Sequence, residues 1–397
     1  MPQRTRPPSE AGETAVNAPL NVGEARRRAR SRLPRGLFEY VERGTEDETG
    51  IATTKTALDG LVFKPRVLVD VSKRDATTRL FGVTQPMPLV VAPTAVAGLV
   101  WYDGEVELAK AAAAVGIPFC VSTQSITSIE RIAGESGARL WFQLYVWRKR
   151  ERALELVRRA ERAGAEALVL TVDTAVTPNR EYNIRNGFGI PIKPSLRAGL
   201  DCLAHPRWFA GVFAKYLRNG GVPTYAHYPE EFRTALGRVA VGDEISLAQD
   251  VGWDDVRSLR DAWKGKLILK GVLRADDAER AAELGVDGIV VSNHGARNLD
   301  HAIHPVRCLA DIAERVGGRV TVLADSGVRR GSHVAGYLGL GAQGVLLGRS
   351  VLYGLATGGA AGAQAVLELV QRELLTTMGF LGAPTVADIT GTVERPR

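Results

Sequence analysis

The chain has 397 residues, of which 45% are hydrophobic and 24% charged, and its formal net charge is +7. This length and composition allow one large folded domain, and a mild basic excess without a recognition motif does not indicate a nucleic-acid-binding protein. The three cysteines, Cys120, Cys202 and Cys308, are widely separated. Their spacing gives neither a disulfide framework nor a metal site, and it favours a reducing compartment.

The N-terminal residues are polar and rich in Pro and Ser, and they lack the apolar core of a signal peptide. We therefore expect a disordered extension over residues 1–22 and a single folded domain over residues 23–397. The domain begins with a helical pattern that ends in a glycine stop signal near Gly60. No run of 18 or more apolar residues occurs, so no membrane-spanning helix is expected.

Short, apolar, β-rich runs then alternate with longer amphipathic stretches along the rest of the chain. Several runs are apolar throughout, which is typical of parallel strands covered on both faces. The runs are residues 88–92, 118–123, 140–146, 167–173, 267–272, 288–293, 320–325 and 344–348. A strand–helix alternation repeated eight times predicts an α/β fold, a (β/α)8 TIM barrel with a short helical N-terminal segment.

The fourth crossover is far longer than a normal connection between a strand and a helix. Residues 187–240 of this crossover are expected to form an inserted loop or lid. The insertion combines aromatic and apolar residues with basic ones: Trp208, Phe209, Val212, Phe213, Tyr216, Leu217, Arg207, Lys215 and Arg218. A basic amphipathic segment can lie on an anionic membrane, but a helix packed on the barrel is an equally open interpretation.

Candidate site residues end or follow the apolar runs, where a TIM barrel carries its active site, and Lys270 lies inside the fifth run. They are Pro93, Thr94 and Ala95; Ser122 and Gln124; Gln143 and Tyr145; Thr171 and Asp173; Lys270; Ser292, Asn293 and His294; Asp325, Ser326 and Gly327; and Gly348 and Arg349. One such residue is usually a cap or a turn. Eight strand ends that share the feature indicate a functional site.

The segment SNHGARNLD at residues 292–300 carries the strongest signal for chemistry. His294 can act as a general base near neutral pH, and Arg297 offers a planar fork that matches a carboxylate. The glycine-bearing turns after strands seven and eight form the usual phosphate site, with Arg329 or Arg349 as the cation. Lys270 in an interior strand requires an anion, either a barrel carboxylate or a ring that becomes anionic on reduction.

The segments SNHGARNLD, FQLYV, TVDT, APTA and ADSGVRRG together resemble the FMN-dependent 2-hydroxy-acid oxidising family. The match covers nearly the whole chain, and RGTEDETG, LWFQLYV, LADSGVRRG and GRSVLYGLA are most similar to the bacterial mandelate and L-lactate dehydrogenases of that family. The resemblance implies a TIM barrel that binds FMN and oxidises an (S)-2-hydroxy acid to the 2-keto acid. Homotetramers are common in the family, so a homotetramer is expected.

The resemblance also implies a role for each candidate residue. His294 is the expected base, Tyr145 bonds the developing charge on the substrate oxygen, and Asp173 pairs with the protonated histidine. Tyr40, Arg180 and Arg297 are expected to hold the substrate carboxylate. The expected FMN contacts are Pro93, Thr94, Ala95, Ser122, Gln143, Thr171, Lys270 and Ser292 around the ring, with Asp325, Ser326, Gly327, Arg329, Gly348 and Arg349 at the ribityl and phosphate groups.

Departures from the family pattern leave the substrate and the electron acceptor open. Gln124 lines the predicted substrate pocket, where glycolate oxidase has tryptophan and mandelate dehydrogenase has a small residue. WYDGE at 101–105 replaces the commoner HPxGE, and Ser326 replaces a glycine of many oxidases.

Two interpretations of the activity remain, and a third is remote. The first is a dehydrogenase that passes electrons to a quinone, cytoplasmic or peripheral on the inner face of the cell membrane. The second is a soluble oxidase that reduces O₂ to H₂O₂. A non-catalytic role is remote because the charged residues are all present, and His294 with Arg297 disfavours other FMN barrels. The choice between hydride transfer and a carbanion route also stays open.

Overall fold

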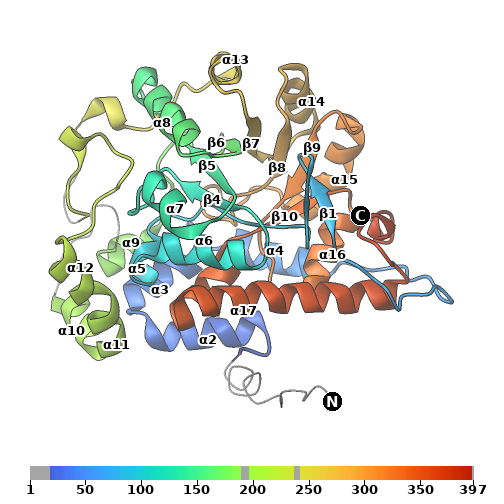
Figure 1. Cartoon of the computed structure of the whole chain (residues 1–397), viewed down its shortest axis with the longest axis horizontal. Coiled ribbons are helices and arrows are strands. Elements are labelled where there is room, and N and C mark those ends of the chain that lie inside the picture. The colour runs from blue at the N-terminus through green and yellow to red at the C-terminus, as the bar shows by residue number, and fades with distance from the viewer. Residues whose placement is uncertain (1–17, 189–195, 237–241, 396–397) are drawn as a thin grey trace, which may run out of the picture.

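The computed structural model describes residues 18–188, 196–236 and 242–395. Eight parallel strands form a closed barrel in the order β10-β3-β4-β5-β6-β7-β8-β9 (Figure 1). The strands are β3 (Leu89–Val91), β4 (Phe119–Ser122), β5 (Leu140–Leu144), β6 (Ala167–Thr171), β7 (Lys266–Val272), β8 (Gly288–Val291), β9 (Thr321–Ala324) and β10 (Gly344–Leu347). Each strand coincides with one of the predicted apolar runs, and the TIM barrel is confirmed.

The strands are apolar throughout because both of their faces are covered. One set of side chains fills the inside of the barrel: Val90, Cys120, Trp141, Val169, Ile268, Val290, Leu323 and Leu346. Alternate residues such as Leu89 and Val91 point outward into the core beneath the surrounding helices. Because side chains alternate along a strand with a period of two, one half of them packs inside the barrel and the other half packs between the barrel and the helices.

A β-hairpin that the strand pattern did not predict closes the N-terminal end of the barrel. It consists of β1 (Thr78–Leu80) and β2 (Val83–Gln85), paired antiparallel. Phe81 at its turn packs against the inner core and lies edge-on to Trp141, with 5.6 Å between ring centroids. The hairpin therefore covers this end of the inner core, and the cavity lies at the opposite end, where the strands finish.

Helices surround the barrel and complete the N-terminal segment. They are α2 (Val22–Arg32), α3 (Arg35–Glu42), α4 (Thr49–Asp59), α5 (Ala97–Val100), α6 (Gly104–Ala114), α7 (Ile129–Ser136), α8 (Arg150–Arg162), α13 (Trp253–Ala262), α14 (Ala275–Glu283), α15 (Pro305–Val316), α16 (Gly331–Gly339) and α17 (Arg349–Leu381), with a 3-10 turn η4 (Ala387–Ile389) near the C-terminus. Figure 1 shows α17 beside α2 along one side of the molecule. Helix α17 is kinked at Gly358 and Gly359, where the backbone leaves helical geometry.

The expected N-terminal extension, residues 1–22, falls largely on residues 1–17, which lie outside the described residues. Helix α2 begins at Val22, one residue before the expected start of the folded domain. The side chain of Asn21 accepts a hydrogen bond from the backbone N–H of Glu24, so Asn21 is the N-cap of this helix.

The long fourth crossover is largely helical where it is described. It contains α9 (Glu181–Asn186), α10 (Leu196–Ala204), α11 (Pro206–Trp208), the π-helix η1 (Phe209–Phe213), α12 (Ala214–Asn219) and the 3-10 turns η2 (Glu230–Phe232) and η3 (Asp243–Ile245). Trp208 donates its indole N–H to the carbonyl of Leu99 at 2.7 Å, and the Tyr216 hydroxyl accepts from the N–H of Asp103 at 3.0 Å. These bonds dock the segment onto α5 and the start of α6. Residues 189–195 and 237–241 lie outside the described residues, and no described helix is long and apolar enough to cross a membrane.

Candidate active site

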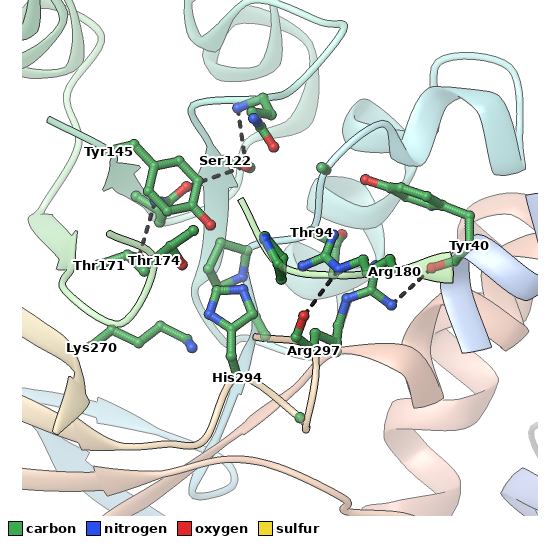
Figure 2. Close-up of a pocket in the computed structure, with 18 of the residues that line it drawn as sticks. Tyr40, Thr94, Ser122, Tyr145, Thr171, Thr174, Arg180, Lys270, His294 and Arg297 are labelled. Atoms are coloured by element: carbon green, nitrogen blue, oxygen red, sulfur yellow. Dashed lines mark hydrogen bonds between the residues drawn. The ribbon is translucent and has the colours of Figure 1, made fainter. Parts of the chain in front are cut away.

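The C-terminal ends of the strands open into a cavity of about 780 Å³. Figure 2 shows side chains from the strand ends converging on it. The predicted site residues that line the cavity are Tyr40, Pro93, Thr94, Ala95, Ser122, Gln124, Gln143, Tyr145, Thr171, Arg180, Lys270, His294, Arg297, Asp325, Ser326, Gly327, Arg329, Gly348 and Arg349. Asp173 and Ser292 do not line the cavity and lie directly behind residues that do.

His294 lies on a tight loop that follows β8. The φ angles of His294, Gly295 and Ala296 are 57°, 65° and 57°, so three successive residues adopt the left-handed conformation. The Ser292 hydroxyl accepts from the His294 N–H at 3.0 Å, and the Ser326 hydroxyl accepts from the Gly295 N–H at 3.1 Å. A backbone this strained persists only where its surroundings hold it, and such strain is concentrated at functional sites.

The imidazole of His294 is fixed by Asp173, the second residue after β6. The His294 Nδ1 lies 2.8 Å from Asp173 Oδ1, and the two side chains are 20% and 16% exposed. An ionised carboxylate only accepts hydrogen bonds, so Nδ1 carries the proton and Nε2 is left as the free nitrogen. Asp173 is therefore an orienting partner of His294.

The electrostatics of this pair favour a neutral imidazole beside an ionised carboxylate. Burial lowers the pKa of His294, and the charges of Lys270 and Arg180 lower it further against the opposing effect of Asp173. Burial raises the pKa of Asp173, but the interactions with His294 and Lys270 outweigh it and the pKa is lowered overall. At neutral pH His294 is consequently able to accept a proton.

Tyr145 presents a phenol to the same cavity. Burial is the main cause that raises the pKa of Tyr145, and the negative charge of Asp173 adds to it. The hydroxyl therefore stays protonated and can donate a hydrogen bond to an oxygen that gains negative charge.

The guanidinium groups of Arg180 and Arg297 lie together on the far side of His294 from Lys270 (Figure 2). Arg297 Nη1 donates to the carbonyls of Tyr40 at 2.8 Å and Arg43 at 2.9 Å, and its guanidinium lies 5.3 Å from the centroid of the Tyr40 ring. Arg180 Nε donates to the carbonyl of Arg297 at 3.0 Å. Burial and the charge of Arg297 both lower the pKa of Arg180. Two guanidiniums that bond to carbonyls rather than to carboxylates form a binding site for an anion.

Lys270 is a buried cation in the middle of β7. Its Nζ lies 3.2 Å from Asp325 Oδ2 and donates to the Ser292 hydroxyl at 3.0 Å. Burial lowers the pKa of Lys270, but Asp325 and Asp173 outweigh this effect and raise it, so the amine stays charged. Ser292 is fully buried behind the amine, where its hydroxyl orients Lys270, and its expected contact with the cofactor stays a prediction.

The turns after β9 and β10 provide a second cationic region. Arg349 donates to the carbonyl of Gly295 at 2.9 Å and to that of Val41 at 3.1 Å. Burial and the charges of Arg297 and Arg329 lower the pKa of Arg349 to about 10. A buried guanidinium with other arginines around it is stabilised by a bound anion, as expected for a phosphate site.

The ends of β3 to β6 form a polar wall opposite these cations. Gln143 donates to the Thr171 hydroxyl at 3.0 Å and accepts from the Ser122 hydroxyl at 3.2 Å. The hydroxyl of Thr94 is buried without a hydrogen-bond partner among the described residues. A buried polar atom of this kind indicates that a ligand supplies the missing bond.

Several residues that line the cavity were not predicted from the sequence. Gln124 lines it as expected, and Tyr228 of the fourth crossover lines the same cavity. Ile245 and Leu247 of the same crossover add an apolar wall. Nothing in the local pattern of the insertion could have placed these side chains. Thr174, beside Asp173 in the TVDT motif, could have been identified from that position.

The chain matches the family model described as FMN-dependent dehydrogenase over residues 29–395. It is 40% identical to (S)-mandelate dehydrogenase from Pseudomonas putida, with 93% of this chain and 92% of the relative covered. It is also 40% identical to an L-lactate dehydrogenase from Caulobacter vibrioides, with 94% and 96% covered.

Solved structures agree with these relatives. The crystal structure of the monotopic membrane protein (S)-mandelate dehydrogenase superposes with a TM-score of 0.89 at 38% identity, and 95% of this chain and 100% of that chain are covered. A mandelate oxidase variant with (S)-mandelic acid superposes with a TM-score of 0.81 at 33% identity, with 96% and 99% covered.

Proposed function

The chain belongs to the FMN-dependent dehydrogenase family, and we propose that it oxidises a mandelate- or lactate-like (S)-2-hydroxy acid to the 2-keto acid. The observation that carries the proposal is the meeting of two groups in one cavity. One group is His294 with Asp173, and the other is the pair Arg180 and Arg297. A base beside a carboxylate-binding pair suits the removal of a proton from a hydroxy acid.

The residues of the cavity fit FMN in charge and in hydrogen-bonding groups. The polar wall formed by Ser122, Gln143 and Thr171 would face the edge of the ring, and the unpartnered hydroxyl of Thr94 would gain a hydrogen bond. Lys270 would place a positive charge beside the ring, and Arg329 and Arg349 would hold the phosphate. When bound, FMN accepts the two electrons that the substrate loses.

The protein residues bind the substrate and move its proton. Arg180, Arg297 and Tyr40 hold the carboxylate and so determine which face of the reacting carbon is presented. His294 accepts the proton at Nε2, the nitrogen that Asp173 leaves free. Asp173 then stabilises the imidazolium, while Tyr145 donates to the substrate oxygen. These residue roles are compatible with both the hydride route and the carbanion route.

An anaerobic titration tests the proposed substrate class. The purified protein is expected to be yellow, and its flavin absorbance should bleach with (S)-mandelate, L-lactate or glycolate but not with (R)-mandelate or D-lactate. The compound that bleaches it at the lowest concentration identifies the substrate. Persistence of the oxidised spectrum with every 2-hydroxy acid would rule out the proposed function.

The electron acceptor is tested separately with the same substrate. A dehydrogenase that uses a quinone should turn over with a quinone analogue and form little H₂O₂ under air. Stoichiometric H₂O₂ would instead assign the alternative, a soluble oxidase.

Membrane contact through the fourth crossover forms a second part of the proposal. Leu196, Leu200 and Leu203 recur along one face of α10 and are 88%, 63% and 68% exposed. Figure 1 shows α10, α11 and α12 gathered at one end of the molecule, and Arg207 and Arg218 are exposed there. An exposed apolar face with flanking arginines suits an anionic bilayer. The structural relative described as monotopic supports this reading.

Flotation with vesicles tests the membrane contact. The protein should float with vesicles that contain anionic lipid, and Leu200→Asp combined with Leu203→Asp should abolish flotation. Phe380→Asp is a matched control, because Phe380 is 81% exposed at the end of α17, outside the crossover. Equal flotation of the two variants would contradict the assignment of α10.

A further inference from the structure

The side chain of Asn298 connects two parts of the site that come from different segments. Its Nδ2 donates to the backbone carbonyl of Asp173 at 2.8 Å and to the Thr174 hydroxyl at 2.8 Å, and its Oδ1 accepts from Arg180 Nη2 at 3.2 Å. The orientation of the amide is unambiguous, because a carbonyl can only accept and a guanidinium can only donate. One amide thus uses both of its ends.

The bond from Asn298 to Thr174 is the first of a series of hydrogen bonds that leads to the base, His294. Because the hydroxyl of Thr174 accepts from Asn298, its own proton is free to point at Asp173 Oδ1, which lies 3.2 Å away. The same carboxylate oxygen accepts from His294 Nδ1 at 2.8 Å. A continuous chain of hydrogen bonds therefore runs from Asn298 through Thr174 and Asp173 to His294.

The oxygen of the Asn298 amide fixes Arg180, the residue proposed to hold the substrate carboxylate. Arg180 lies at the N-terminal end of α9 in the long crossover, and within the described residues two hydrogen bonds join it to the loop after β8, from Nε to the carbonyl of Arg297 and from Nη2 to Asn298. Without the second bond the guanidinium can rotate about the first. Its fork would then lose the fixed direction that a bidentate contact needs.

We propose that Asn298 is a positioning residue that sets Arg180 and the Asp173–His294 pair in register, so that one neutral amide fixes both the substrate carboxylate and the base. The inference rests on the proposed function and adds a residue that contacts neither the substrate nor the flavin in that scheme. The neighbouring Asn293 shows the contrasting local role, because its Oδ1 only accepts from the Ala296 N–H at 3.3 Å within the loop.

Asn298→Ala and Thr174→Val separate the two functions of the amide. Asn298→Ala loses one bond to a charged group and two to neutral groups, so kcat/KM should fall about 10- to 100-fold, through a higher KM and a lower kcat together. Thr174→Val removes the link to Asp173 and the acceptor of one Asn298 bond, but it keeps the bond between Asn298 and Arg180. It should lower kcat and leave the Kd for pyruvate or benzoylformate, measured by calorimetry, near that of the wild type.

The pH profile gives a readout that loss of packing does not reproduce. A carboxylate that loses the donor Thr174 binds the imidazolium proton of His294 more tightly. The acid limb of kcat/KM should therefore move to higher pH in Thr174→Val. It should move by a smaller amount in Asn298→Ala, where Thr174 keeps its hydroxyl but the amide no longer holds it toward Asp173. Asn186→Ala is the control, since the Asn186 amide donates to Glu39 at 2.5 Å between α9 and α3, and neither residue lines the cavity. It should change neither the pH limb nor the Kd.

The outcomes distinguish this inference from the proposed function. A lower Tm and flavin content in Asn298→Ala with an unchanged pH limb and unchanged Kd would reduce Asn298 to a structural residue and overturn the inference. If no hydroxy acid bleaches the wild type, the proposed function fails. The Kd of the 2-keto acids for Asn298→Ala still decides whether the amide orients Arg180.

Discussion

Asp173→Asn tests the electrostatic role of the carboxylate beside the base. Asparagine has nearly the same volume and can keep its Oδ1 at the present 2.8 Å from His294 Nδ1, so the change removes charge and little else. A hydrogen bond to a charged group contributes about 1.5–3 kcal/mol. At about 1.4 kcal/mol per tenfold change in rate, kcat should fall about 10- to 150-fold.

The same variant should change the pH dependence in a defined direction. Asp173 is the group that opposes the lowering of the His294 pKa by burial, Lys270 and Arg180. Its loss lowers that pKa further. Because the base works only when neutral, activity is lost as the pH falls through its pKa, and the acid limb of kcat/KM should move to lower pH.

Anaerobic stopped-flow reduction of the flavin across the acidic and neutral range measures both effects, with Tm and flavin content as controls for folding. The Tm should fall modestly, because the lowered pKa of Asp173 means that its surroundings stabilise the ionised carboxylate more than burial destabilises it, and asparagine loses that stabilisation. A variant with wild-type kcat and an unmoved acid limb would refute the pairing as an element of catalysis.

Three further substitutions test the rest of the site. His294→Gln should retain flavin but lower turnover about 10²- to 10⁴-fold, and near-normal turnover would exclude His294 as the base. Arg180→Met should raise KM about 10- to 100-fold with a smaller effect on kcat, and an unchanged KM would argue against carboxylate binding. Gly271→Ala should lower both kcat and Tm, because φ is +106° and a Cβ would lie 2.6 Å from Asp173, and an active, stable variant would show that Asp173 tolerates displacement.

The sequence was sufficient to predict the barrel and most of the residues that line the cavity. The strands are short apolar runs whose period is a local property, and parallel strands bring all their C-terminal ends to one side. Polar residues at or near those ends, such as Lys270 and Gln143, therefore had to converge on one cavity. The β1–β2 hairpin was missed because strands of three residues at 78–80 and 83–85 are too short for alternation to be recognised.

The roles that were only implied by resemblance depend on contacts across long stretches of chain. The spacing of residues nominated Asp173 and His294 as strand-end side chains, but the 2.8 Å contact between residues 121 positions apart exists only because the barrel closes. Tyr40 lies on α3, and its backbone carbonyl reaches Arg297 only after the N-terminal segment packs over the mouth of the barrel.

The sequence by itself determined a (β/α)8 barrel, the location of its active end and the residue types available there, because apolar periodicity and strand-end position are encoded locally. Only the tertiary structure decided which groups meet. It places Ser292 behind Lys270 instead of in the cavity, brings Tyr228 and Gln124 into one cavity lining, and gives Asn298 three partners from the start of the fourth crossover. These contacts join segments whose relative positions are set by barrel closure and by packing of the crossover, which no local pattern specifies.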